Sequence, residues 1–351
     1  MNSSAKQKGI ALIYVLLIFA LITLMASQIV TSLWLHTEKN ARYLERIQAK
    51  HYALGAEQYI ALLLEQDFED DKKNKRIVDH EKEKWNIDTV GYDVDQGDIE
   101  IVIIDEQSRF NINWLADSSS EENTDPNAQG QNQGRNQRGN DGEKQNDNAN
   151  YLEMLQNLLL TQALDPQLAY KIKDWLDSDQ EAAEAGAEDL VYLALENPRR
   201  TADTEMVSIS ELKLIQGIGD DELEKLIPLV TALPKQSKIN LNTALPEVIR
   251  SISKNISEGD AQALIDARGE KGFDKMADLN NLASLSGKTA PFQSAPVEFS
   301  SSYFSAYIKA TYRDTTFYLK TSLIRNSDGQ VQVGGREIGP SSYWATTKKE
   351  S

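Results

Sequence analysis

The feature that most constrains this chain is an uncharged run of 26 residues, Ile10 to Leu35, which contains no Asp, Glu, Lys, Arg or His. A helix of about 20 apolar residues crosses the hydrocarbon core of a bilayer. The run is therefore long enough to span a membrane with some tilt. A cleavable secretory signal fits poorly, because the nearest small-x-small site, Leu24-Met25-Ala26, begins with a large residue. Basic residues stand on both sides of the run, so flanking charge leaves its orientation open.

The composition argues against several classes of function. The 351 residues include 37 Lys and Arg against 54 Asp and Glu, a net charge of −17. Nucleic acid is therefore not expected as a partner, because its binding relies on basic side chains that neutralise phosphates. Without cysteine there can be no disulfide, Cys-ligated zinc or Cys nucleophile. The chain has only three histidines and no P-loop or dinucleotide fingerprint, so we do not expect an enzyme.

Secondary-structure patterns predict a small α/β unit with an insertion. Apolar and small residues continue beyond the uncharged run at helical spacing, which predicts one helix from Ile10 to about Gln66, its second half lying on a sheet. Ile99 to Ile104 predicts a strand, and Tyr303 to Ile324 predicts two strands that meet near Arg313-Asp314-Thr315. The middle of the chain is poor in strand signals. We therefore expect it to be inserted into the α/β unit.

The inserted part begins with a polar tract. Asp117 to Asn150 contains no Val, Ile, Leu, Met or aromatic residue and cannot form a core, so it is expected to be a mobile loop or linker. The chain from Tyr151 to Leu285 has a helical pattern throughout. The predicted helices are Tyr151 to Ala163, Gln167 to Leu176, Ser210 to Gln216, Asp221 to Leu233, Pro246 to Ile252 and Ser257 to Arg268.

Carboxylates are concentrated between Asp174 and Asp189. Such a concentration of like charge favours a hard divalent cation with oxygen ligands, although a solvated acidic loop has the same composition. Compared with an EF-hand, the first, third, fifth and twelfth positions are acidic, but the sixth is Ala182 where the turn needs Gly. The stretch therefore departs from the EF-hand pattern. A membrane-anchored hydrolase that used these carboxylates around a catalytic metal is a further alternative, and metal-dependent turnover would reveal it.

A glycine turn, Gly217-Ile218-Gly219, resembles a helix-hairpin-helix, whose backbone N–H groups bind DNA phosphate. Membrane-anchored DNA receptors of the competence type carry such turns, which makes this the alternative function. Here Asp220, Asp221 and Glu222 follow the turn directly, where they would repel phosphate. We therefore interpret the glycines as turn residues in a helical packing domain.

Longer motifs resemble one family. Lys8-Gly9-Ile10-Ala11-Leu12 resembles the leader junction of type IV pilins and type II secretion pseudopilins. Trp175-Leu176-Asp177-x-Asp179 and Gly186-Ala187-Glu188-Asp189-x-x-Tyr192 resemble the WLDxD and GAEDxxY motifs of type II secretion system protein K. Four more stretches resemble further motifs of that family, in the same order along the chain: Phe110 to Asn113, Met206 to Leu212, Pro228 to Pro234 and Lys238 to Ala244.

The resemblance implies an α+β, pilin-like fold: a long N-terminal helix and a small antiparallel sheet, with a large inserted all-helical domain that is SAM-like or helix-hairpin-helix-like. The expected parts are a prepilin-type leader (1–9), the transmembrane part of the helix (10–35), the first part of the pilin-like body (36–115), a low-complexity loop (116–150), the inserted helical domain (151–290), the C-terminal strands of the body (291–336) and a tail (337–351).

The resemblance also implies functional residues. Prepilin peptidase would cleave between Gly9 and Ile10, and Ile10 would be N-methylated. Most pilins carry Glu at the fifth mature position, where this chain has Tyr14; that departure points to a tip subunit with nothing above it, or to a protein that never assembles. Members of the family bind calcium. The implied structural Ca²⁺ ligands are Asp177, Asp179, Glu188 and Asp189, with Asp174 and Glu184 as further candidates.

The function implied is that of a minor pseudopilin. Such a protein caps the periplasmic pseudopilus of the type II secretion system and supports export of folded proteins across the outer membrane. The expected partners are the I- and J-type minor pseudopilins in a tip complex, the major pseudopilin and the prepilin peptidase. The expected location is the bacterial inner membrane, as a single-pass protein whose C-terminal part is in the periplasm.

Overall fold

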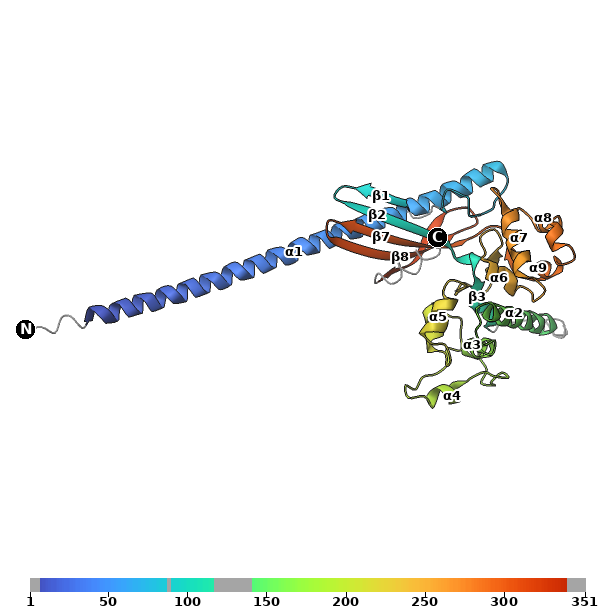
Figure 1. Cartoon of the computed structure of the whole chain (residues 1–351), viewed down its shortest axis with the longest axis horizontal. Helices are drawn as coiled ribbons and strands as arrows, with labels where there is room; N and C mark the ends of the chain where they lie inside the picture. The colour runs from blue at the N-terminus through green and yellow to red at the C-terminus, as the bar shows by residue number, and fades with distance from the viewer. Residues whose placement is uncertain (1–6, 87–89, 117–140, 340–351) are drawn as a thin grey trace, which may run out of the picture.

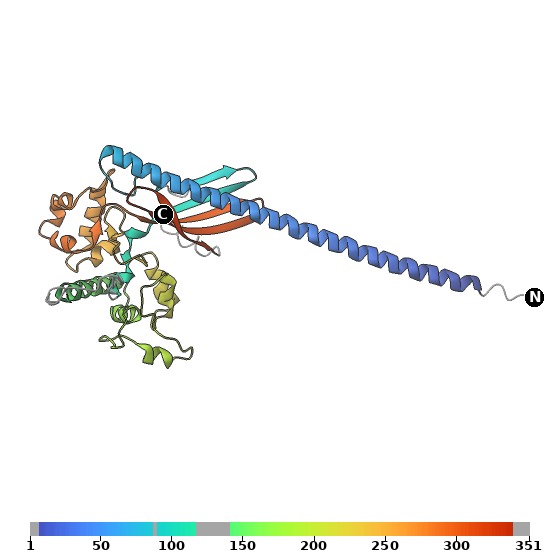
Figure 2. The ribbon, with the colours of Figure 1, turned by 180° about the vertical axis from the view of Figure 1, so that it is seen from behind.

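The computed structural model describes residues 7–86, 90–116 and 141–339 (Figure 1). Its dominant element is helix α1, Gln7–Asn74, whose N-terminal part extends away from the rest of the molecule (Figures 1 and 2). The predicted helix is confirmed, and it continues beyond Gln66. The last turn carries Lys72 and Lys73, whose charges favour a helix C-terminus.

The body is a five-stranded antiparallel sheet with strand order β1-β2-β7-β8-β9. The strands are β1 (Val90–Val94), β2 (Gly97–Asp105), β7 (Tyr303–Tyr312), β8 (Thr315–Arg325) and β9 (Val331–Ile338). The three predicted strands are β2, β7 and β8, and β7 and β8 meet at Arg313, which adopts the left-handed conformation with φ 51°. Strands β1 and β9 at the two edges were not predicted.

The second half of α1 covers one face of this sheet (Figure 2). Alternate residues of β2, β7 and β8 point toward the helix because side chains alternate along a strand. The helix contributes residues three or four positions apart, which share one face. The helix side of this core consists of Ala49, Ala53, Ala56, Ile60 and Leu64, and the sheet side is centred on Ile101, Ala306, Ile308 and Leu319.

The helical domain is inserted between β2 and β7. Asp105 at the end of β2 and Phe304 at the start of β7 are partners in the sheet register, so the chain leaves and re-enters the sheet at adjacent points. The inserted helices are α2 (Asp141–Thr161), α3 (Leu168–Leu176), α4 (Asp189–Leu193), α5 (Asp220–Leu226), α6 (Pro246–Ser251), α7 (Glu258–Arg268), α8 (Met276–Asn280) and α9 (Ala290–Ser294). The 3₁₀ turns are η1 (Glu106–Ser108), η2 (Ile112–Leu115), η3 (Ile209–Leu214) and η4 (Ala283–Leu285).

The insertion has a hydrophobic core of its own, separate from that beneath α1. Trp114, Leu155, Ile172 and Leu241 are among its buried members. Two elements of the insertion begin with capping boxes: Ser208 with Glu211 at η3, and Ser257 with Asp260 at α7. The insertion therefore packs as a second unit attached to the body.

Three local predictions need correction. Residues 141–150, expected within the low-complexity loop, form the first part of α2, while residues 117–140 lie outside the described residues, as do most of the expected leader and tail. The helix expected over Asp221 to Leu233 ends at Leu226, because Val230–Thr231 form strand β4 and pair with β3, Phe110–Asn111. A second short parallel pair joins β5 (Ile239–Asn240), within the part expected to be all-helical, to β6 (Val297–Glu298), within the part expected to form C-terminal strands. At β4, tertiary pairing overrides the local helical pattern.

Candidate metal site and membrane helix

The acidic stretch lies between two helices that are anchored in the core. Helix α3 ends at Leu176, with Asp177 as its C-cap, and α4 begins after Glu188, its N-cap. Trp175 and Tyr192 are buried and pack edge to face, with ring centroids 5.2 Å apart. The aromatic contact brings the helix ends together, so the carboxylates that flank it converge.

Three buried carboxylates meet at this point. Asp174, Asp177 and Glu188 each place an oxygen within 4.8 Å of an oxygen of the other two. Asp174 Oδ2 accepts a hydrogen bond from the Ala183 backbone N–H at 3.0 Å, and Asp177 Oδ2 accepts one from Lys173 Nζ at 2.8 Å. Asp177 Oδ1 and both oxygens of Glu188 have no hydrogen-bond partner among the described residues. Buried acceptors without donors are costly, so these oxygens favour the binding of a cation or of protons.

The electrostatics point the same way. Burial is the largest cause that raises the pKa of Asp174, Asp177 and Glu188, and the neighbouring carboxylates raise it further. The pKa of Glu188 is raised to about 7. Three carboxylates near one ammonium group repel one another, and a divalent cation would relieve this repulsion.

The donor set fits calcium. Carboxylate oxygens are hard ligands, and calcium accepts several of them in flexible geometry. The loop also holds the cluster closely, since a Cβ built on Gly186 would lie 1.8 Å from Asp174 Oδ2. Only glycine leaves room for that carboxylate. A cation here would join the end of α3 to the start of α4, which is a structural role.

The other implied ligands lie elsewhere. Asp179 is exposed and accepts the Glu181 backbone N–H at 2.8 Å, and Glu184 is also exposed. Asp189 accepts two hydrogen bonds from Thr201, both 3.0 Å long. The structure therefore brings together Asp174, Asp177 and Glu188 and leaves Asp179, Glu184 and Asp189 outside the cluster. The three-residue spacing of Asp174 and Asp177 was the sequence signal that these two share a helix face.

A backbone N–H of the glycine turn is already hydrogen-bonded to a carboxylate of the same chain. Gly217 has φ +95°, which favours glycine, and the backbone N–H of Gly219 donates to Glu222 Oε2 at 2.9 Å. Lys213 Nζ lies 2.5 Å from Asp220 Oδ1. A phosphate that approached this turn would have to displace the Glu222 carboxylate.

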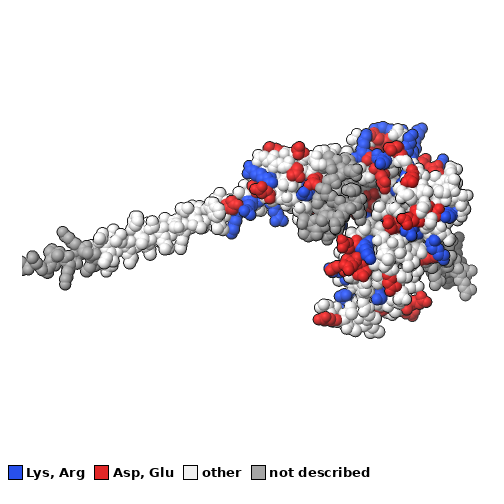
Figure 3. Space-filling model, in the orientation of Figure 1, with Lys and Arg blue, Asp and Glu red and all other residues white. Residues whose placement is uncertain are grey.

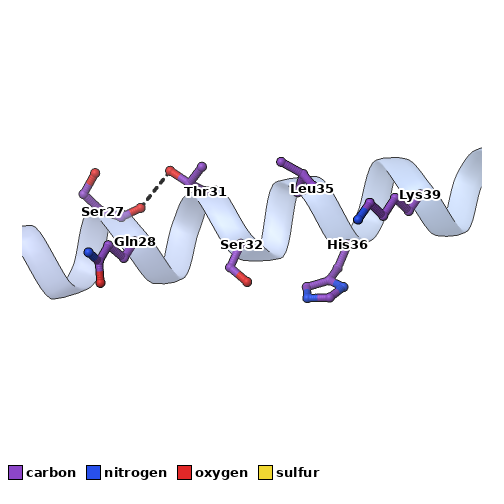
Figure 4. Close-up of a pocket in the computed structure, with 7 residues that line it drawn as sticks. All are labelled: Ser27, Gln28, Thr31, Ser32, Leu35, His36 and Lys39. Carbon is purple, nitrogen blue, oxygen red and sulfur yellow. Dashed lines mark hydrogen bonds between the residues drawn. The ribbon is translucent and has the colours of Figure 1, made fainter.

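From Ala11 to Leu35, α1 contains no charged residue and exposes its large apolar side chains, and the face seen in Figure 3 is white along this stretch. It is long and apolar enough to cross a membrane, and none of its most apolar stretch is buried against the protein. Polar residues gather toward its C-terminal end, from Ser27 and Gln28 to His36 and Lys39 (Figure 4). The Thr31 hydroxyl donates to the Ser27 carbonyl at 2.9 Å, which satisfies it within the helix. Gly9 and Ile10 lie in the first turns of α1.

Comparisons with known proteins agree with one another. Family models described as Type II secretion system (T2SS), protein K, match residues 108–235 and 239–299. The chain is 30% identical to Type II secretion system protein K of Pseudomonas aeruginosa over 95% of this chain and 93% of that one. It is 29% identical to the Aeromonas hydrophila protein of the same name, over 94% and 97%.

A solved structure shows the same fold. It is a chain from the crystal structure of the GspK-GspI-GspJ complex of the enterotoxigenic Escherichia coli Type 2 Secretion System. The superposition has a TM-score of 0.66 at 23% identity and covers 87% of this chain and 100% of that one. The long helix, antiparallel sheet and helical regions are therefore a pilin-like arrangement.

Proposed function

The chain belongs to the type II secretion system protein K family, and from this premise we propose that it is the minor pseudopilin that caps the tip of the periplasmic pseudopilus. In this role it would support export of folded proteins across the outer membrane. The observation that carries the proposal is the placement of the inserted domain. It lies at the end of the molecule opposite the N-terminus and projects to one side of α1 (Figure 1).

The geometry explains why such a subunit would terminate a fibre. In a pilus, neighbouring subunits pack their N-terminal helices side by side and follow one another along the axis. A bulky domain beside the sheet would collide with subunits stacked above it but is accommodated at the top. Tyr14, in place of the usual Glu, supports the same position, because a terminal subunit needs no acidic partner for a following amine.

The proposed partners are the I- and J-type minor pseudopilins in a tip complex, with the major pseudopilin below. The solved complex similar to this chain contains GspI and GspJ, which supports this choice. We place the uncharged part of α1 in the inner membrane, where association between helices depends on close packing. The remainder would lie in the periplasm.

Labelling of assembled fibres tests the cap. An epitope on the full chain should be found at one end only of isolated pseudopili. In a matched variant, a two-residue turn replaces residues 106–302 and joins Asp105 to Tyr303, at the adjacent ends of β2 and β7. This shortened chain should label the shaft as well, because the obstacle is gone. Labelling of the full chain along the shaft would contradict capping.

Leader processing is the second part of the proposal. We expect prepilin peptidase to cleave between Gly9 and Ile10 and the new N-terminus of Ile10 to be methylated. Glycine suits close approach of a protease to the backbone. Mass spectrometry of the mature chain should show N-methylated Ile10, and a bulky substitution at Gly9 should leave the leader attached. Normal processing of that variant would count against the assignment.

We also propose that Asp174, Asp177 and Glu188 hold a structural calcium ion. The three unpartnered oxygens of Asp177 and Glu188 support it. Calcium at 100 times its dissociation constant should stabilise the chain by about 2.7 kcal/mol. The double variant Asp174→Asn, Asp177→Asn should lose this gain in thermal unfolding, whereas Glu184→Gln, an exposed position, should keep it. An equal gain in both variants would refute the site. The metal has no catalytic part in this proposal.

A further inference from the structure

A second group of carboxylates lies in the body, at the C-terminal end of α1. Asp67 belongs to α1, while Asp79 and Glu83 belong to the segment that follows it. One carboxylate oxygen of each residue lies within 4.8 Å of one from each of the others. This body cluster is separate from the cluster in the inserted domain, because its residues contribute to a different unit of the fold.

Asp79 is the centre of the body cluster and is 0% exposed. Its Oδ2 accepts the Ser301 backbone N–H at 2.7 Å and is paired with Arg325. Asp79 Oδ1 has no hydrogen-bond partner among the described residues. Asp67 Oδ2 also receives no hydrogen bond there, although Arg325 Nη1 lies 3.9 Å from it. Two buried anionic oxygens in one cluster are thus left without a donor.

Glu83 is held in place by neutral donors. The Trp85 indole N–H donates to Glu83 Oε2 at 2.7 Å, and the His80 backbone N–H donates to the same oxygen at 3.1 Å. The His80 ring lies 3.3 Å from Glu83 Oε1, and its Nδ1 accepts the Lys82 backbone N–H at 3.2 Å. Because Nδ1 accepts a hydrogen bond, the His80 imidazole is neutral and its Nε2–H points to Glu83. Burial lowers the pKa of His80, which favours the same neutral form.

The charges do not balance. Asp67, Asp79 and Glu83 contribute three carboxylates, and Asp71 adds a fourth nearby, with its Oδ2 accepting the Val78 N–H at 2.7 Å. Within the described parts of the chain, Arg325 is the one arginine or lysine that forms ion pairs with the body cluster. Burial first, and then the neighbouring carboxylates, raise the pKa of Glu83 to about 9 and of Asp67 to about 7. Either protons or a cation must therefore neutralise these groups.

We propose that Asp67, Asp79 and Glu83 bind a hard divalent cation, calcium or magnesium. All three residues offer carboxylate oxygens, which these cations prefer. A hollow in the surface is lined by Glu83, Trp85 and Asn86, so it reaches one of the three residues of the body cluster. The cation would fasten the end of α1 to the following segment, and through Asp79 and Arg325 to the end of β8.

Counting bound calcium in the full chain tests this inference. The protein is purified in detergent and stripped of metal, with Asp174→Asn and Asp177→Asn introduced to remove the first site. Equilibrium dialysis against calcium should still show about one bound ion per chain. Adding Asp67→Asn should abolish it, while Asp70→Asn, a neighbour at the surface that is paired with Lys73, should leave it intact. Repeating the dialysis with magnesium in the buffer shows which of the two cations binds the body cluster more tightly.

Two outcomes overturn the inference. No bound calcium or magnesium in the first-site variant means that protons neutralise the body cluster, and a bound ion that survives Asp67→Asn means that it binds elsewhere. Terbium provides a second readout, because the Trp85 indole contacts Glu83 and should sensitise emission from a bound ion. Substitution Trp85→Phe should quench this emission, while circular dichroism verifies that the variants fold. Neither outcome bears on tip capping, which the fibre labelling tests separately.

Discussion

At the scale of single residues, the cluster of Asp174, Asp177 and Glu188 in the inserted domain depends on a glycine. Gly186 lies against the Asp174 carboxylate, and that carboxylate is fixed by the Ala183 backbone N–H. Glu188 supplies the two oxygens that most need a cation, since neither has a partner in the described structure. The calcium binding that we propose here would therefore be sensitive both to backbone space at Gly186 and to the protonation of Glu188.

We expect Gly186→Ala to weaken calcium binding by at least about tenfold, which corresponds to about 1.4 kcal/mol. The new Cβ would displace the Asp174 carboxylate from the cluster. Isothermal calorimetry of the full chain measures the affinity. Gly55→Ala is the matched control: nothing lies within 4 Å of a Cβ at this helical position, so it should leave calcium affinity unchanged and stabilise α1 by about 1 kcal/mol. Unchanged binding by Gly186→Ala would show that Asp174 is not a ligand.

The raised pKa of Glu188 predicts a pH dependence. Without calcium, the folded state keeps a proton on Glu188 up to about pH 7, whereas the unfolded state loses it near the ordinary pKa of 4.5. Between these two pH values the folded state therefore binds more protons than the unfolded state. The contribution of Glu188 to the free energy of unfolding falls as the pH rises from about 4.5 to about 7. Urea unfolding of calcium-free protein should show this fall relative to Glu188→Gln. Parallel curves for the two proteins would rule the effect out.

At the scale of elements, α1 has two surroundings along one continuous helix. Its first half exposes apolar side chains in every direction, as a membrane-spanning helix does. Its second half presents a narrow stripe of small residues to the sheet, with Ala49 and Ala53 fully buried. Small side chains allow the helix to lie close to β7 and β8, so the spacing between helix and sheet is set by these alanines.

Enlarging one of these alanines should disturb the body. We expect Ala53→Leu to destabilise the folded chain by about 1–3 kcal/mol, because the extra methyl groups have no space against the sheet. Ala41→Leu, at an exposed position of the same helix, should have little effect. Thermal unfolding in detergent compares the two. Equal melting temperatures would mean that helix and sheet are packed loosely at Ala53.

At the scale of the whole molecule, a buried polar network joins body and insertion. Asp105, at the end of β2, accepts hydrogen bonds from the side chains of Asn240, Thr243 and Ser301. Asn240 also donates to the Asp79 carbonyl at 2.9 Å. Since both passages between the units run through this network, its hydrogen bonds fix the orientation of the helical domain relative to the sheet.

Removing the central amide should loosen that joint. We expect Asn240→Leu to cost about 2–4 kcal/mol, because it leaves the buried Asp105 carboxylate short of a donor. Differential scanning calorimetry should then resolve two transitions, one for each unit. Asn255→Leu, at an exposed position in the insertion, should retain the wild-type profile. A single unshifted transition in Asn240→Leu would show that the network does not couple the units.

The candidate site was only partly predictable. The sequence located the acidic stretch, but it ranked Asp179 and Asp189 with Asp177 and Glu188, and it placed Asp174 second. The structure turns Asp179 into solvent and pairs Asp189 with Thr201, while Asp174 is buried in the cluster. Which carboxylates converge depends on the contact of Trp175 with Tyr192, which is a tertiary interaction.

By itself the sequence determined the membrane-length helix, the main strands and the family, because these are properties of contiguous residues: absence of charge, periodicity and motif spacing. Only the tertiary structure decided the edge strands β1 and β9 and the meeting of Asp67 with Asp79 and Glu83. Those features depend on pairing or burial against another element of the fold, whose free energy is not carried by the pattern of the segment itself.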